Sequence, residues 1–181
     1  MRPALKIGLV VFAVLLVIGI FLPVVARIRG AAARIHCSNN LKQVLLAVQN
    51  YHDTYGKFPP GTRPSNDLPV DKRLSWLFEL VPFVESDNPY TMAKKDEPWD
   101  SPGNRCLLEY DRVFLCPSGP RMRHGYTSGL THFVGIAGIG EDAATYPLGD
   151  KRIGIFGYDR QVSIKDVKDG LGNTLLVAAQ Q

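Results

Sequence analysis

The chain has 181 residues, of which 45% are hydrophobic and 21% are charged, so it has room for one globular domain and an appendage but not for several large domains. Its formal charge of +4 is uneven, because residues 1–62 carry seven Lys and Arg against one acid, Asp53, whereas the remainder carries fourteen against sixteen. Only Arg121 and Arg123 suggest a basic patch on the folded part, so we expect no nucleic acid partner.

An uncharged run of twenty residues extends from Ile7 to Ala26, with Pro23 near its end, after a basic leader at 1–6. At a rise of about 1.5 Å per residue, such a helix spans roughly 30 Å, the thickness of a bilayer core. The alternative is a cleaved secretory signal ending at Val24-Val25-Ala26, although the run exceeds the usual signal core of about 7 to 15 residues. We therefore expect a retained transmembrane helix.

The basic residues on the two sides of this run do not fix its orientation. Arg27, Arg29 and Arg34 follow the run and outnumber Arg2 and Lys6, which precede it. On the positive-inside count alone, this excess favours a cytoplasmic C-terminal side.

The next segment has the periodicity of an amphipathic helix. Its apolar stripe begins at Cys37, and the following members recur at helical spacing: Leu41, Val44, Leu45, Val48, His52 and Tyr55. Residues 27–36 lack such a stripe and are expected to form a solvated helical neck. Gly56 and the pair Pro59-Pro60 predict the end of the helix. The pattern thus predicts one helix of about fifty residues, kinked at Pro23, that joins membrane and domain.

Residues 37–181 are expected to form one α+β domain on this helix. A second helix is predicted over residues 74–86, bent or ended at Pro82. Four strand-like runs follow, at residues 112–116, 131–137, 152–158 and 173–179. Because helices precede strands and no repeated βαβ alternation occurs, the order favours a small antiparallel sheet packed on the long helix.

Several stretches resemble the landmarks of a pilin-like family, the domain-of-unknown-function family numbered 1559. They are CSNNLKQVLLAVQNYHDTYGKFPPGT, SWLFELVPFVE, EPWDSPGNRCLL, FLCPS, FVGIAGIG and DVKDGLGNTLLVA. The resemblance covers most of residues 37–179 and implies a pseudopilin-like architecture, with an exported domain anchored in the bacterial cytoplasmic membrane. It implies other pilin-like or secretion-system subunits as partners, beside the lipid bilayer, and no established activity.

The chain departs from the family pattern at its N-terminus. A type IV prepilin has a processing glycine followed by Phe-Thr-Leu-Ile-Glu, whereas here Gly8 precedes a run in which the fifth residue is Ala13. The acid that pairs with a neighbour's N-terminal amine in pilin-like filaments is therefore missing. The Glu expected after the last strand is also absent.

No catalytic signature is recognised, and we expect a protein that is not an enzyme. Residues 138–143, GIGEDA, fit a dinucleotide fingerprint, but Pro147 and Gly149 interrupt the helix that it requires, which favours a glycine turn. No nucleophile elbow or P-loop is present, and the four histidines lack the spacing of a zinc site. His52 is expected to be a partly buried packing residue.

Two polar stretches allow a structural and a binding interpretation. Residues 97–103, EPWDSPG, resemble a sugar-binding platform around Trp99, but two prolines favour a plain turn. In residues 163–174, Ser163 and Asp166 favour a capping box, with a turn at Asp169. Alternatively, Asp166, Asp169 and Asn173 supply oxygen ligands for calcium, as in the C-terminal loops of major pseudopilins; no other cofactor is expected.

The three cysteines allow one bridge in an exported domain, in any of three pairings. Cys37 and Cys116 lie inside the family-like motifs, whereas Cys106 interrupts one. Cys37 also faces the core side of the long helix, where a strand carrying Cys116 can approach to the 5.5–6 Å typical of bridged α-carbons. We predict a Cys37–Cys116 disulfide, against the alternative of three buried thiols.

These features favour a membrane-anchored structural or assembly subunit of the bacterial envelope, similar to pilins and pseudopilins. The alternative is an extracytoplasmic solute- or glycan-binding module on the same anchor, with a concave pocket near Trp76 or Trp99.

Overall fold

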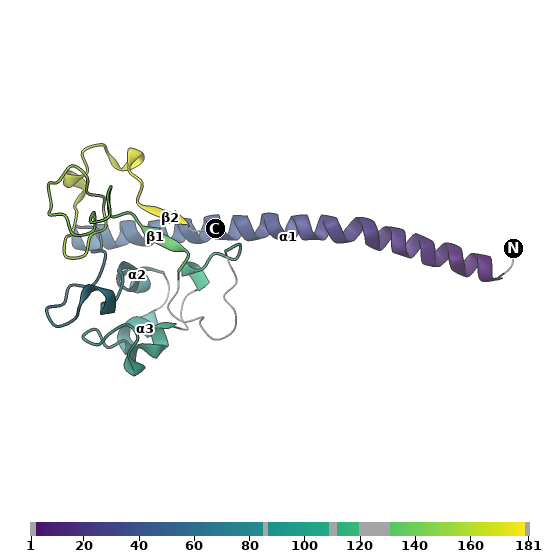
Figure 1. Ribbon diagram of the computed structural model, residues 1–181, viewed down its shortest axis with the longest axis horizontal. Helices are drawn as coiled ribbons and strands as arrows, with labels where there is room; N and C mark the ends of the chain where they lie inside the picture. Colours follow the sequence, from purple (N-terminus) through teal and green to yellow (C-terminus); the bar gives the residue numbers. More distant parts are fainter. Residues whose placement is uncertain (1–2, 85–86, 109–111, 120–130, 180–181) are drawn as a thin grey trace.

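The computed structural model describes residues 3–84, 87–108, 112–119 and 131–179. Its main element is one uninterrupted α-helix, α1 (Pro3–Tyr55), of 53 residues. Figure 1 shows α1 as a gently curved rod whose N-terminal half projects from the head, while the rest of the chain gathers around its C-terminal part. The helix continues through Pro23. One helix from the apolar run to the domain is therefore confirmed.

The buried stripe of α1 begins at Cys37, as the periodicity predicts. Cys37, Val44 and Val48 are buried, and Leu41 and Leu45 pack at the edge of the core. The expectation for Tyr55 is wrong, because this side chain is 59% exposed and Tyr51 takes its place in the core. Tyr51 follows Val48 at i+3 on the buried stripe, whereas the ring of Tyr55 lies at the edge of the head, 4.6 Å from the ring of Tyr51 and 6.3 Å from that of Phe83.

Gly56 ends α1 in the left-handed conformation that the sequence predicts. Its φ is +74°, and its N–H donates to the carbonyl of His52 over 2.6 Å. The chain then turns back into the head, where the N–H of Phe58 donates to the carbonyl of Val162 and that of Gly61 to Gly157. His52 is half-buried and its ring lies 4.8 Å from that of Phe58, so the expectation of a packing histidine is confirmed.

The second predicted helix is present but short. Helix α2 (Trp76–Leu80) is followed at once by a 3-10 turn, Val81–Phe83, that contains Pro82. Because proline lacks the N–H that an α-helix needs, Pro82 accounts for this change. Helix α3 (Asp87–Met92) follows, and 3-10 turns span Val70–Lys72, Pro102–Leu108, Ile164–Asp166 and Leu171–Asn173.

The sheet has two strands, β1 (Phe133–Gly135) and β2 (Val177–Ala179), which pair antiparallel with Phe133 opposite Ala179. They lie within two of the four strand-like runs and confirm the α+β fold. The expectation for residues 112–116 is wrong, because Arg112–Phe114 is a 3-10 helix.

Residues 152–158 do not form the predicted strand either. They make two isolated bridges, Gly138 with Ile153 and Phe156 with Gln161. The backbones cross closely here, since a Cβ on Gly138 would lie only 2.1 Å from the carbonyl oxygen of Arg152. Glycine therefore permits a crossing of loops where an alternating pattern suggests a ladder.

One hydrophobic core unites the C-terminal part of α1 with the head. Its members are buried and come from α1, α2, both strands and the loop before residue 160; among them are Val44, Val48, Leu80, Phe133, Ile155, Phe156 and Val177. Burial of each large side chain contributes roughly 1.5–3 kcal/mol to folding. The C-terminal part of α1 is therefore a structural component of the head.

Candidate functional site: the anchor helix and its junction with the head

The N-terminal half of α1 presents apolar side chains that nothing in the described structure covers. At least 40% of each of the following side chains is exposed: Val11, Phe12, Val14, Leu15, Leu16, Val17, Ile18, Ile20, Phe21, Leu22, Val24, Val25 and Ile28. So continuous an apolar surface is unfavourable in water and marks a site of contact with lipid or protein.

Of the three residues expected to mark the anchor, Pro23 and Ala26 are exposed, and Ile7 lies within α1. The helix is long and apolar enough to cross a membrane, it lies near the N-terminus, and none of its most apolar window is buried. A signal sequence near the N-terminus passes the same test of length and composition. Through the neck at 27–36 the side chains stay exposed, except for half-buried Ala33.

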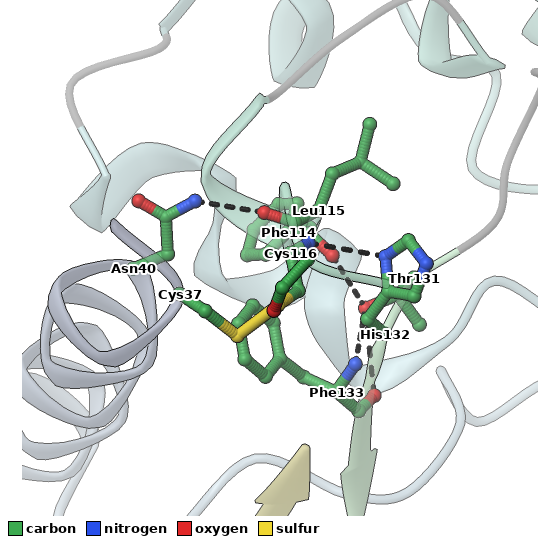
Figure 2. Close-up of a disulfide and its surroundings, with 9 residues drawn as sticks. Cys37, Asn40, Phe114, Leu115, Cys116, Thr131, His132 and Phe133 are labelled. Atoms are coloured by element: carbon green, nitrogen blue, oxygen red, sulfur yellow. Dashed lines mark hydrogen bonds between the residues drawn. A yellow bond between two sulfur atoms is a disulfide. The ribbon is translucent and has the colours of Figure 1, made fainter. Parts of the chain in front are cut away.

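The junction between α1 and the head contains a disulfide between Cys37 and Cys116, the pair predicted from the sequence. Their α-carbons lie 4.7 Å apart, and both residues are buried. Figure 2 shows a second connection one turn further along α1, where the side-chain amide of Asn40 donates to the carbonyl of Leu115 over 2.8 Å. The disulfide therefore lies at the point where the exposed part of α1 meets the core.

A hydrogen-bond network continues from the disulfide to β1. The N–H of Cys116 donates to Nδ1 of His132 over 3.1 Å, and the N–H of His132 donates to the carbonyl of Phe114. The hydroxyl of Thr131 donates to the same carbonyl over 2.9 Å (Figure 2). In this bond Nδ1 of His132 is the acceptor. This network connects α1 to the sheet through the segment 114–116.

The stretch 163–174 adopts the predicted capping box. The carboxylate of Asp166 accepts hydrogen bonds from the N–H and the hydroxyl of Ser163, both at 2.8 Å, and these bonds lower the pKa of Asp166. Asp169 is exposed, and its carbonyl accepts a bond from the side-chain amide of Asn173. Among the described residues, no group of three or more His, Cys, Asp or Glu side chains is placed to hold a metal ion.

The stretch 97–103 is a turn built around Asn104, which the sequence reasoning did not single out. Asn104 is fully buried; its side chain accepts a bond from the N–H of Lys94 and donates to the carbonyls of Lys94, Glu97 and Pro98. The indole N–H of Trp99 donates to the carbonyl of Asp71 over 2.9 Å. The two prolines predicted the turn, and an asparagine directly after Pro-Gly is the sequence signal that could have identified Asn104 within it.

Residues 138–143 form a glycine turn and not a dinucleotide site, because turns and bends follow Gly138 where the fingerprint needs a helix. The turn is held by Arg160, a second residue that the sequence analysis missed. Arg160 is only 7% exposed, and its guanidinium donates to the carbonyls of Ala137, Ala143, Tyr146, Gly154 and Phe156. Nothing distinguishes Arg160 in the sequence from an exposed loop arginine.

Near the end of α1, an ion pair and a tyrosine lie inside the head. Arg63 contacts Glu79 over 2.7 Å, and Glu79 is largely buried. Burial and the charge of Glu79 raise the pKa of Tyr51 to about 12, so its hydroxyl is protonated at neutral pH. Trp76 is buried against Phe156, with ring centroids 4.6 Å apart. Arg121 and Arg123 lie outside the described residues.

The model of one protein family, described as "Protein of unknown function (DUF1559)", matches residues 26–181 of the chain. No curated protein and no solved structure matches the chain. The family match begins at Ala26, so it includes the neck and the head and leaves out most of the apolar run. With most of its length matched, the chain belongs to the DUF1559 family of proteins of unknown function.

Proposed function

We propose that this protein is a membrane-anchored structural or assembly subunit of the bacterial cell envelope, similar to pilins and pseudopilins and without enzymatic activity. Residues 7–26 cross the cytoplasmic membrane once, the N-terminus is cytoplasmic and the head is exported. Its partners are the bilayer and other pilin-like or secretion-system subunits, and none is a nucleic acid.

The observation that carries the proposal is that the two parts of α1 have different surroundings. The large apolar side chains described in the membrane-length run of its N-terminal half are exposed, and its C-terminal part supplies Val44, Val48 and Tyr51 to the core of the head. Because both parts belong to one helix, a force or a contact at the membrane end is transmitted directly to the head. Such a continuous connection suits a subunit that packs beside others through its helix.

The disulfide supports export of the head. Disulfides persist in oxidising compartments and are rare in the cytosol. Cys37 and Cys116 lie directly beyond the neck, so their bond supports an exported position for the head from its first residues onward.

Crosslinking in native membranes tests the assembly role. Ala31 lies in the exposed neck and Lys168 on the head, so Ala31→Cys and Lys168→Cys form a matched pair, each in a Cys106→Ser background. With a short bis-maleimide, we expect Ala31→Cys to give covalent oligomers at least fivefold more efficiently than Lys168→Cys. Mass spectrometry then identifies whether the neighbour is a copy of this chain or another pilin-like subunit. Monomers alone at both positions contradict the proposal.

A further inference from the structure

A cavity of about 460 Å³ lies on the head, and its lining residue Gln161 donates to the hydroxyl of Tyr51 on α1 over 3.4 Å. Three segments that are distant in the sequence form it: Val70 at the start of a 3-10 turn, residues 144–148, and residues 158–161. Its volume is in the range of small-molecule sites. Neither Trp76 nor Trp99 lines this cavity, so it is not the pocket that the sequence analysis expected near one of these tryptophans.

Hydrogen bonds and an ion pair hold the walls of the cavity together. Arg160 donates to the carbonyl of Tyr146 over 2.8 Å, and the N–H of Tyr158 donates to the carbonyl of Ala144 over 2.9 Å. Arg73 joins the remaining wall, because it contacts the carboxylate of Asp159 at 2.6 Å and donates to the carbonyl of Leu68 at 2.8 Å. The cavity is therefore formed before any ligand binds, which lowers the entropic cost of binding.

The charges at the cavity are already compensated. The carboxylate of Asp159 is paired with Arg73. The terminal nitrogens of Arg160 donate to backbone carbonyls. Its Nε atom is buried and lies so close to Gly157 that a Cβ at that glycine would be only 2.6 Å from it, so a ligand cannot reach this nitrogen. Among the described lining residues, no cation is free to balance an anionic ligand. A ligand that carries no net charge fits best.

The remaining lining combines apolar surfaces with neutral polar groups. Pro147 and Tyr158 offer apolar surfaces, and Tyr146 adds a ring whose centroid lies 4.2 Å from the guanidinium carbon of Arg152. The hydroxyl of Thr145 donates to the carbonyl of Asp142, and the amide nitrogen of Gln161 donates to the hydroxyl of Tyr51. The hydroxyl oxygen of Thr145 and the side-chain carbonyl of Gln161 can therefore accept hydrogen bonds from a ligand. A sugar ring has matching chemistry, since its C–H face packs on aromatic rings and its hydroxyls both donate and accept hydrogen bonds. We propose that this cavity binds a neutral saccharide, either free or as a unit of an envelope polysaccharide. This proposal goes beyond the assembly role and does not depend on it.

Saturation-transfer NMR on the full-length protein tests the site. The protein is placed in nanodiscs made without glycolipid or sugar-based detergent, and the probes are cellobiose, maltose, digalactose, N,N′-diacetylchitobiose and, as the acidic comparison, digalacturonate. We expect transfer to the ring C–H protons of at least one neutral disaccharide and weaker binding of digalacturonate than of digalactose. A hexasaccharide of the same sugar distinguishes a free saccharide from a unit of a polysaccharide. A site for a polysaccharide should bind the hexasaccharide more tightly than the disaccharide, whereas a site for a free sugar should not.

Two variants locate the binding. Tyr158→Ala and Gln161→Ala should each weaken the affinity at least tenfold, whereas Gln49→Ala, an exposed glutamine on α1, should leave it unchanged. Near-UV circular dichroism shows whether each variant keeps the folded head. Absence of transfer from every neutral probe, unchanged affinity in both cavity variants, or preference for digalacturonate would overturn the proposal.

Discussion

At the scale of single residues, buried polar side chains hold the loops of the head. The side chains of Asn104 and Arg160 together make nine hydrogen bonds. In eight of them they donate to backbone carbonyls, and in the ninth Asn104 accepts from a backbone N–H. Burial lowers the pKa of Arg160, but a guanidinium stays protonated at physiological pH. Because the described part of the head contains only two strands, each of three residues, these side chains replace the hydrogen bonds that a larger sheet would supply.

Replacement of Arg160 should therefore destabilise the head strongly. Arg160→Met removes donors from five carbonyls, and we expect the free energy of unfolding to fall by about 3 kcal/mol or more. The matched control is Arg152→Met, an exposed arginine paired with Asp150, where the loss should stay below about 1 kcal/mol. Urea unfolding followed by tryptophan fluorescence measures both. Equal effects would refute the structural role of Arg160.

Tyr51 provides a prediction about alkaline pH. Burial, followed by the charge of Glu79, raises the pKa of Tyr51 from 10.0 to about 12. Because the folded state disfavours the tyrosinate, this group stabilises the fold fully below pH 10, and the contribution is lost as the pH rises from 10 through about 12. In absorbance titrations, one of the seven tyrosines should ionise last, and Tyr51→Phe should remove that step. If Tyr51→Phe leaves the late step in place, the assignment is wrong.

At the scale of elements, the head depends on α1 and on the disulfide that fastens it. The bond joins residues 79 apart, so in the chain-entropy model it stabilises the fold by about 4 to 5 kcal/mol. We expect Cys116→Ala to unfold at a correspondingly lower urea concentration, and Cys106→Ala to leave this midpoint nearly unchanged. Non-reducing peptide mapping of protein from native envelopes should recover the peptide that links Cys37 to Cys116. A bridge that contains Cys106, or alkylation of all three thiols, would contradict this pairing.

The elements differ in how far the sequence predicts them. Helix α1 follows from local rules, because an apolar run, a 3.6-residue stripe from Cys37 and the cap at Gly56 all act within a few residues. The strand predicted at 152–158 was wrong because alternation alone cannot reveal that backbones cross at Gly138 and Gly154. The strand predicted at 112–116 was wrong because a short apolar run does not by itself distinguish a strand from the 3-10 turn found at Arg112–Phe114. Arg160 was missed for a related reason, since its acceptors lie up to 23 residues away along the chain.

At the scale of the whole molecule, our prediction of the orientation in the membrane rests on the disulfide and the family resemblance, and it opposes the charge count. We predict that the N-terminus is cytoplasmic and residues 27–181 are exported. An alkaline phosphatase fused after Gln181 should be active, because this enzyme folds only where its own disulfides form. A green fluorescent protein at the same position should stay dark. The opposite pair of results would place the head in the cytoplasm.

The last prediction separates an anchor from a signal sequence, two states that the length and composition of α1 allow alike. If the apolar run is retained, α1 remains continuous from membrane to head, and the mature protein begins before Ile7. It then stays with membranes in carbonate and high salt and is released only by detergent, since some twenty apolar residues remain in the bilayer. N-terminal sequencing of the extracted protein checks this directly. A mature chain that begins at Leu9 would mean prepilin processing after Gly8 despite Ala13, whereas one that begins at Arg27 would release the head with only its neck and remove the basis for assembly through the helix.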